Sequence, residues 1–123
     1  MNKCKRVQQV WYPAVGDGTY LDMSSRSRPV IEVVIGGWGN SGSKIRPSLQ
    51  GKDISPFVRG KVLDPNAFTH FVIDYSGPDI IVIREGIELM RAANWKNHIT
   101  DVVSIGLATA WGADGYWRLF YTD

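Results

Sequence analysis

The chain has 123 residues, of which 44% are hydrophobic and 21% are charged, and its formal net charge is +2. This length fits one domain with one hydrophobic core over residues 1–123, and the composition argues against a disordered chain. Lys and Arg are scattered along the sequence, which argues against nucleic acid as a partner.

The start of the chain bears on where the protein works. Cys4 is the single cysteine, so no internal disulfide can form, whereas small secreted domains usually have several. Residues 1–9 lack the apolar stretch of a signal peptide, and no apolar run is long enough to span a bilayer. We therefore expect a cytoplasmic protein without membrane insertion, although secretion by another route stays open.

The first half of the chain predicts three strands and a loop. Residues 20–24 predict the first strand, and residues 30–35, which are β-branched at almost every position, predict a buried one. Residues 43–46 can return antiparallel to that buried strand. Residues 47–61 read as a mostly polar connection between two sheets.

The second half contains the clearest hairpin. Residues 68–75 alternate between two faces, with Phe71, Ile73 and Tyr75 on one of them, and a turn joins them to a strand at residues 80–84. A short amphipathic helix is the weaker expectation for residues 87–95. Two more strands are predicted, at residues 102–109 and 116–121. About seven to nine short strands indicate an all-β fold, an antiparallel β-sandwich of jelly-roll type.

Two tryptophan-glycine motifs are the most specific feature of the sequence. The first is Ile-Gly-Gly-Trp-Gly-Asn at residues 35–40, which continues into residues 43–46, and the second is Thr-Ala-Trp-Gly-Ala-Asp-Gly-Tyr-Trp at residues 109–117. With the hairpin between them, these motifs resemble the farnesoic acid O-methyltransferase domain family over about residues 20–120. The resemblance implies methyl transfer to a small acid. In its type, a short Trp-rich β chain, the sequence is also similar to small cytosolic mushroom lectins.

The residues themselves favour recognition over chemistry. A typical methyl-donor site needs parallel strands alternating with helices and a Gly-rich turn, and this chain is too short and too β-rich for it. No set of catalytic residues, no metal-ligand spacing and no cofactor motif stands out. We therefore expect a protein that is not an enzyme, a lectin that binds a glycan or glycoprotein. The alternatives are a small-acid methyltransferase and a protein-interaction domain.

A sugar site pairs a flat aromatic platform with fixed polar groups. The expected ligand-binding residues lie in or beside the two motifs: Trp38, Asn40, Arg46, Trp111, Asp114, Tyr116 and Arg118. Each has a structural alternative: the two motif tryptophans can fill the core, Asn40 can hold a left-handed turn, and the arginines can pair with surface acids. Trp117 is the expected core residue of the last strand. Exposed aromatic residues and sandwich edges also favour a homo-oligomer.

Overall fold

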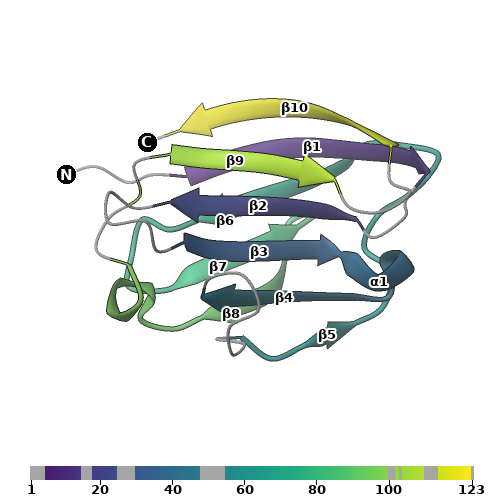
Figure 1. Ribbon diagram of the computed structural model, residues 1–123. Helices are drawn as coiled ribbons and strands as arrows, with labels where there is room; N and C mark the ends of the chain where they lie inside the picture. The colour runs from purple at the N-terminus through teal and green to yellow at the C-terminus, as the bar shows by residue number, and fades with distance from the viewer. Residues whose placement is uncertain are drawn as a thin grey trace.

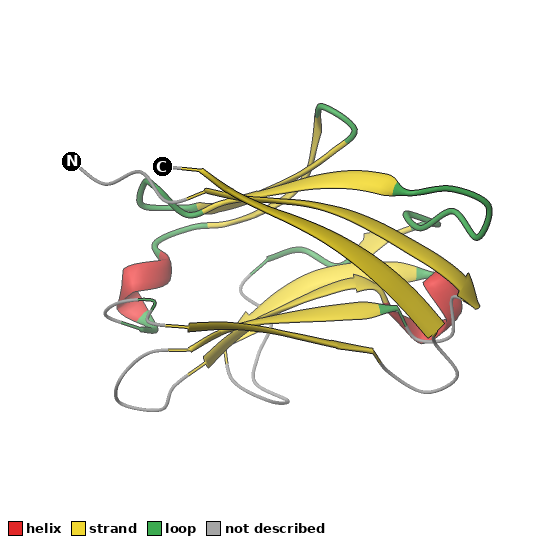
Figure 2. Ribbon diagram, turned by 90° about the horizontal axis from the view of Figure 1, so that it is seen from above, coloured by secondary structure: helices red, strands yellow, loops and turns green. Residues whose placement is uncertain are grey.

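The computed structural model describes residues 5–14, 18–24, 30–47, 55–99, 102, 104–109 and 114–122. Two five-stranded antiparallel sheets lie face to face, as the view from above in Figure 2 shows. Sheet A has the strand order β10-β1-β6-β7-β8, and sheet B has the order β5-β4-β3-β2-β9 (Figure 1). The predicted all-β antiparallel sandwich is confirmed, with ten described strands in place of the expected seven to nine.

The elements have the following bounds. Sheet A contains β1 (Lys5–Ala14), β6 (Thr69–Asp74), β7 (Ile80–Arg84), β8 (Ile87–Ala92) and β10 (Asp114–Thr122). Sheet B contains β2 (Thr19–Ser24), β3 (Val30–Gly36), β4 (Gly42–Pro47), β5 (Val58–Arg59) and β9 (Ser104–Thr109). The helices of the described ranges are α1 (Gly37–Asn40) and the 3₁₀-helix η1 (Trp95–Asn97), and neither is long and apolar enough to cross a membrane.

Both ends of the chain meet in the sheets. β1 pairs with β10, starting from Lys5 opposite Thr122, and β2 pairs with β9. A jelly roll pairs the first strands with the last in the same way. The remaining strands form two meanders, β2 to β5 in sheet B and β6 to β8 in sheet A, so only the outer pairs follow the jelly-roll pattern.

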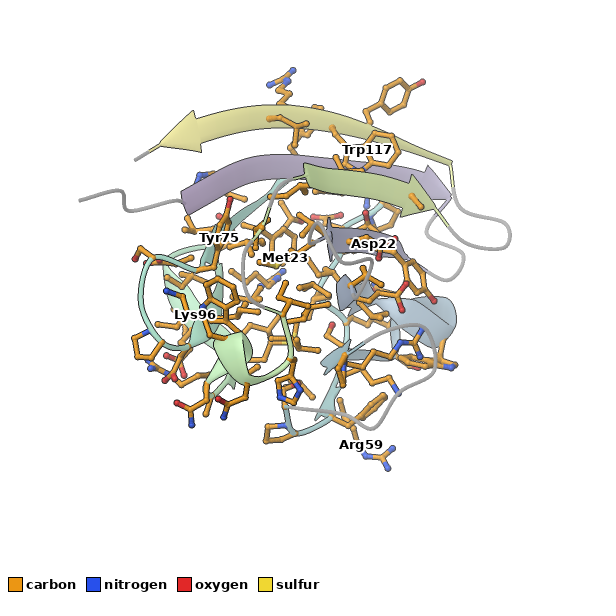
Figure 3. The ribbon with its side chains drawn as sticks, turned by 60° about the vertical axis from the view of Figure 1, so that its left-hand side comes forward. Asp22, Met23, Arg59, Tyr75, Lys96 and Trp117 are labelled. Carbon is orange, nitrogen blue, oxygen red and sulfur yellow. The ribbon has the colours of Figure 1, made fainter. Side chains whose placement is uncertain are left out.

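The core fills the space between the inner faces of the sheets. In β6 the predicted alternation is confirmed: Phe71 and Ile73 are fully buried, and the residues that alternate with them, His70, Val72 and Asp74, are partly exposed. In β3 the prediction of a buried strand is also confirmed, because every residue after Val30 is buried. Other fully buried side chains come from β1, β2, β4 and β7: Val10, Leu21, Met23, Ile45, Ile80 and Val82. Figure 3 shows Met23 inside the sandwich.

Three parts of the chain differ from the sequence expectations. The helix expected at residues 87–95 is strand β8, which pairs with β7, followed by η1. β1 was not predicted, although it is an interior strand of sheet A, between β10 and β6. The expected loop at residues 47–61 contains the two-residue strand β5, and residues 48–54 lie outside the described ranges.

Gly18, just before β2, lets the backbone pass very close to the end of β3. It has a positive φ of 81°, and a Cβ atom there would lie 2.3 Å from the carbonyl oxygens of both Ile35 and Gly36. Backbone atoms cannot yield to such a contact as a flexible side chain can. Gly18 thus sets how closely the chain entering β2 approaches the end of β3.

We expect Gly18→Ala to lower the free energy of unfolding by about 3 kcal/mol or more, because it combines a clash with backbone strain. Urea denaturation followed by circular dichroism measures this change. Gly77→Ala is the matched control, since a Cβ there would meet nothing within 4 Å. Equal midpoints for the two variants would contradict the close approach at Gly18.

Candidate functional site

The two tryptophan-glycine motifs lie at the same end of the sandwich. Thr19 of β2 pairs on one side with Ile35, just before the first motif turns away, and on the other side with Thr109, where the second motif begins. Figure 1 accordingly shows α1 on the same side as the end of β9 and the start of β10. Residues 110–113, with the predicted Trp111, lie outside the described part of the chain.

The first motif forms a left-handed turn. Gly36, Trp38, Gly39 and Asn40 have φ values of 66°, 51°, 71° and 65°. This conformation suits glycine and is tolerated by asparagine, but for a bulky residue such as tryptophan it is a rare outlier. Such strain costs about 1–3 kcal/mol and persists only where surrounding contacts enforce it.

Asn40 supplies the contacts that enforce this turn. Its Nδ2 donates to the carbonyl oxygen of Leu63 at 2.8 Å, and its Oδ1 accepts from the backbone N–H groups of Val62 and Leu63 at 3.1 and 3.0 Å. The residue is buried, with 6% of its surface exposed. Its amide therefore fastens the turn to the segment before β6. Asn40 thus holds a left-handed turn, which is the structural role that the sequence left open for it.

Trp38, by contrast, points outward and forms a surface with three other residues. The exposed fractions are 46% for Trp38 and 41% for Phe57, and the two ring centroids lie 5.4 Å apart. Lys44 Nζ lies 5.1 Å from the Trp38 ring, and the Arg59 guanidinium lies 5.7 Å from the Phe57 ring. We call the surface made by Trp38, Lys44, Phe57 and Arg59 the Trp38–Phe57 face. It offers exposed apolar rings with a cation over each.

Gly42 gives this face its shape. A Cβ atom at Gly42 would lie 2.1 Å from Cζ of Phe57, so the ring rests directly on the backbone of β4. Arg59 sits in β5 opposite Gly42, and Figure 3 shows its side chain extending outward from the molecule. The sequence analysis missed Lys44, Phe57 and Arg59. The available signal was the alternation in β4, which places Lys44 on the outer face of the sheet beside the motif.

Arg46 belongs to a separate row of charged residues across sheet B. Its Nε and Nη2 atoms donate to Oε1 of Glu32 at 2.6 and 2.5 Å, and the Glu32 side chain is 5% exposed. Asp22 lies opposite Glu32 on the next strand, and its Oδ1 is buried without a hydrogen-bond partner among the described residues. Burial, and secondarily the neighbouring Glu32, raises the pKa of Asp22 to about 6, while Arg46 opposes the shift. Arg46 is thus ion-paired with Glu32, and only 16% of its side chain is exposed.

The remaining predicted site residues are on β10. Tyr116 is 54% exposed, and the guanidinium of the exposed Arg118 lies 4.1 Å from the ring centroid of Phe68. Trp117 faces the other way, as expected, and packs against the core, with its Nε1 donating to Oγ1 of Thr19 at 3.4 Å. Asp114 begins the strand and pairs with Ala14. Asn40, Arg46 and Arg118 thus have different partners, and a shared ligand site formed by the seven predicted residues stays a prediction.

Comparison with known protein families shows which family the chain belongs to. A family model described as farnesoic acid O-methyl transferase matches residues 20–121. No curated protein matches closely enough to count as a relative. The expectation that the protein is not an enzyme is wrong, because the matching family is one of methyltransferases. The resemblance to that family is confirmed, and the likeness to mushroom lectins gains no support from the match.

A methyltransferase needs a methyl donor, of which S-adenosylmethionine is the expected one. Nucleotide-containing cofactors commonly bind where parallel strands lead through a Gly-rich turn into a helix. In the described residues all paired strands are antiparallel, and the two helices have four and three residues. The described part of the chain therefore does not fit a donor site of this kind.

We expect Asn40→Ala to lower the free energy of unfolding by about 2–4 kcal/mol, because it leaves two N–H groups and a carbonyl of the segment before β6 without their partner. Urea denaturation measures the loss. Asn97→Ala, at an exposed position of η1, is the matched control and should change stability little. A stable Asn40→Ala protein would show that the turn is held by something else.

Asp22→Asn should make the protein more stable at pH 7, on the order of 1 kcal/mol once solvent screening is allowed for. The folded-state pKa is about 6 and the unfolded value 3.8, so the stability that protonated Asp22 contributes is complete below pH 3.8 and is lost as pH rises to about 6. The stability difference between Asp22→Asn and the wild type should therefore grow over this interval. Thermal unfolding from pH 3.5 to 7.5 tests it.

Glu88→Gln is the control for this experiment. In the wild type, the hydrogen bond from Arg91 lowers the pKa of Glu88, whereas the pKa of Asp22 is raised. This substitution should not stabilise the protein at pH 7. A pH-independent difference between Asp22→Asn and the wild type would contradict the raised pKa of Asp22.

Proposed function

We propose, since this chain belongs to the farnesoic acid O-methyltransferase family, that it acts on an apolar carboxylic acid and holds that acid on the Trp38–Phe57 face. In this role the face positions the acid whose carboxylate receives the methyl group. The family name supports an acid with a long apolar tail as the substrate class.

The observation that carries the proposal is the pairing of each exposed ring with a cation. An apolar acid has a tail that leaves water favourably on an aromatic surface and a carboxylate that is stabilised by a nearby cation. Trp38 and Phe57 provide the aromatic surface, and Lys44 and Arg59 provide the positive charge at its border. A neutral tail without the acid group would use only half of these contacts.

The backbone of Trp38 supports a functional role for its ring. Burial of an aromatic side chain can offset the conformational strain of its backbone. Trp38 has a strained backbone, but 46% of the residue is exposed. Asn40 holds the strained turn with the indole facing outward. Binding of a ligand to the exposed ring accounts for both features.

Glycan recognition is the second candidate, and the same exposed indole favours it. The C–H face of a sugar stacks on an open aromatic ring, and the amino and guanidinium groups of Lys44 and Arg59 can donate to its hydroxyls. A sugar has no need of positive charge, however, whereas a carboxylate does. Neutral and acidic ligands therefore separate the two candidates.

The central test compares farnesoic acid with farnesol, which has the same tail and a hydroxyl in place of the carboxylate. We expect the acid to bind more tightly, with chemical-shift changes at the Trp38 indole in NMR spectra. Lys44→Gln should weaken binding of the acid by about three- to tenfold and leave farnesol unaffected, as expected for one partly exposed cation.

Two variants serve as controls. Lys96→Gln removes the other lysine that lies over a tryptophan, 5.5 Å from the Trp95 ring, and should leave binding unchanged. Trp38→Gly should abolish binding while shifting the unfolding midpoint little, because glycine suits the left-handed turn. Equal affinity for acid and alcohol would exclude the acid proposal, and saturable binding of a neutral sugar at Trp38 would favour the glycan candidate.

A further inference from the structure

The outer edge of β10 is the longest open strand edge in the described part of the chain. β10 has nine residues and pairs with β1 on one side, whereas the other edge strands, β5, β8 and β9, have two, six and six. Figure 1 shows no described strand beyond β10. An open edge presents a row of backbone N–H and C=O groups that a further strand can pair with.

Among the described residues, this edge lacks the usual protection against pairing. Edge strands are commonly blunted by proline, by lysine, by bulges or by being short. From Tyr116 to Thr122 the register with β1 is regular, there is no proline, and Arg118 is the one charged residue. By comparison, the edge strand β8 carries Arg91 and Glu88 in ion pairs at its surface.

Leu119 adds an apolar contact to the open edge. Trp117 pairs with the fully buried Val10, so Trp117 and, two residues later, Leu119 share the core-facing side of sheet A. Leu119 is nevertheless 47% exposed, because it lies at the margin of the sheet. A strand added at this margin would cover it.

We propose that the edge of β10 pairs antiparallel with β10 of a second copy of this chain, joining two A sheets into one continuous sheet. Two-fold symmetry allows a strand to pair antiparallel with itself, since the same surface then serves both partners. The occupant is therefore a second copy with Leu119 of each chain at the symmetry axis.

The charges of β10 select this register. With Leu119 opposite Leu119, Arg118 lies opposite Phe120, and two half-exposed leucines cover each other. With Arg118 at the axis, two guanidinium groups would face each other, which destabilises a cross-strand pair. Moving the symmetry axis by one residue, which shifts the register by two, thus separates a favourable pairing from an unfavourable one.

Sedimentation velocity from low micromolar to submillimolar concentration tests the proposal. The wild type should pass from monomer to dimer, and Leu119→Glu, which places two carboxylates at the axis, should stay monomeric with an unchanged circular dichroism spectrum. Ile87→Glu is the matched control, because Ile87 is 74% exposed on the β7–β8 hairpin, away from β10. This variant should dimerise as the wild type does. A wild type that is monomeric throughout, or a Leu119→Glu dimer, overturns the proposal.

A crosslinking variant keeps the test decisive if Leu119→Glu fails to fold. In a Cys4→Ser background, Leu119→Cys places two thiols directly opposite each other, within the Cα separation that a disulfide accepts. Mild oxidation should give a disulfide-linked dimer. Ile87→Cys in the same background should stay monomeric, and equal crosslinking of both variants would contradict the proposed register.

Discussion

The Asn40 amide is the interaction on which the arrangement of the site depends. One side chain satisfies two backbone N–H groups and one carbonyl of the segment before β6, more than twenty residues away in sequence. These bonds fix a turn in which three consecutive residues are left-handed. Trp38 lies inside that turn, so the direction of its ring is set by the buried side chain of Asn40. The close approach of Gly18 to the carbonyl of Gly36 fixes the same turn from the other side.

Strand β4 distributes its charges between structure and surface. Lys44 and Arg46 are two residues apart and face the same side of sheet B. Arg46 is committed to Glu32 and offsets the charge of a carboxylate that is almost completely buried, while Lys44 lies over the exposed indole. A buried carboxylate without its guanidinium would destabilise the sheet, so these two basic residues are not interchangeable. One alternating strand thus stabilises the sheet with one cation and places the other over the exposed Trp38 ring.

The fold class and most strands could be predicted from the sequence, but less of the candidate site could be. Alternation in residues 69–74 and the β-branched run of residues 30–35 predicted the hairpin and the buried strand, because local pattern and burial agree there. β8 read as a helix because Ile87, Leu89 and Met90 also suit helical spacing, and only pairing with β7 resolves that ambiguity. The exposure of Trp38 and the partners of Asn40 depend on segments distant in sequence, and so do Phe57 and Arg59. No local pattern carries that information.

The pairing of β1 with β10 and of β2 with β9 has a consequence for synthesis on the ribosome. The chain emerges from its N-terminus, yet neither of its first two strands can find all its partners until the last twenty residues have been made. The two meanders can form earlier, because their contacts are local. Both sheets therefore stay incomplete until β9 and β10 have been synthesised, and these two late strands complete the sandwich.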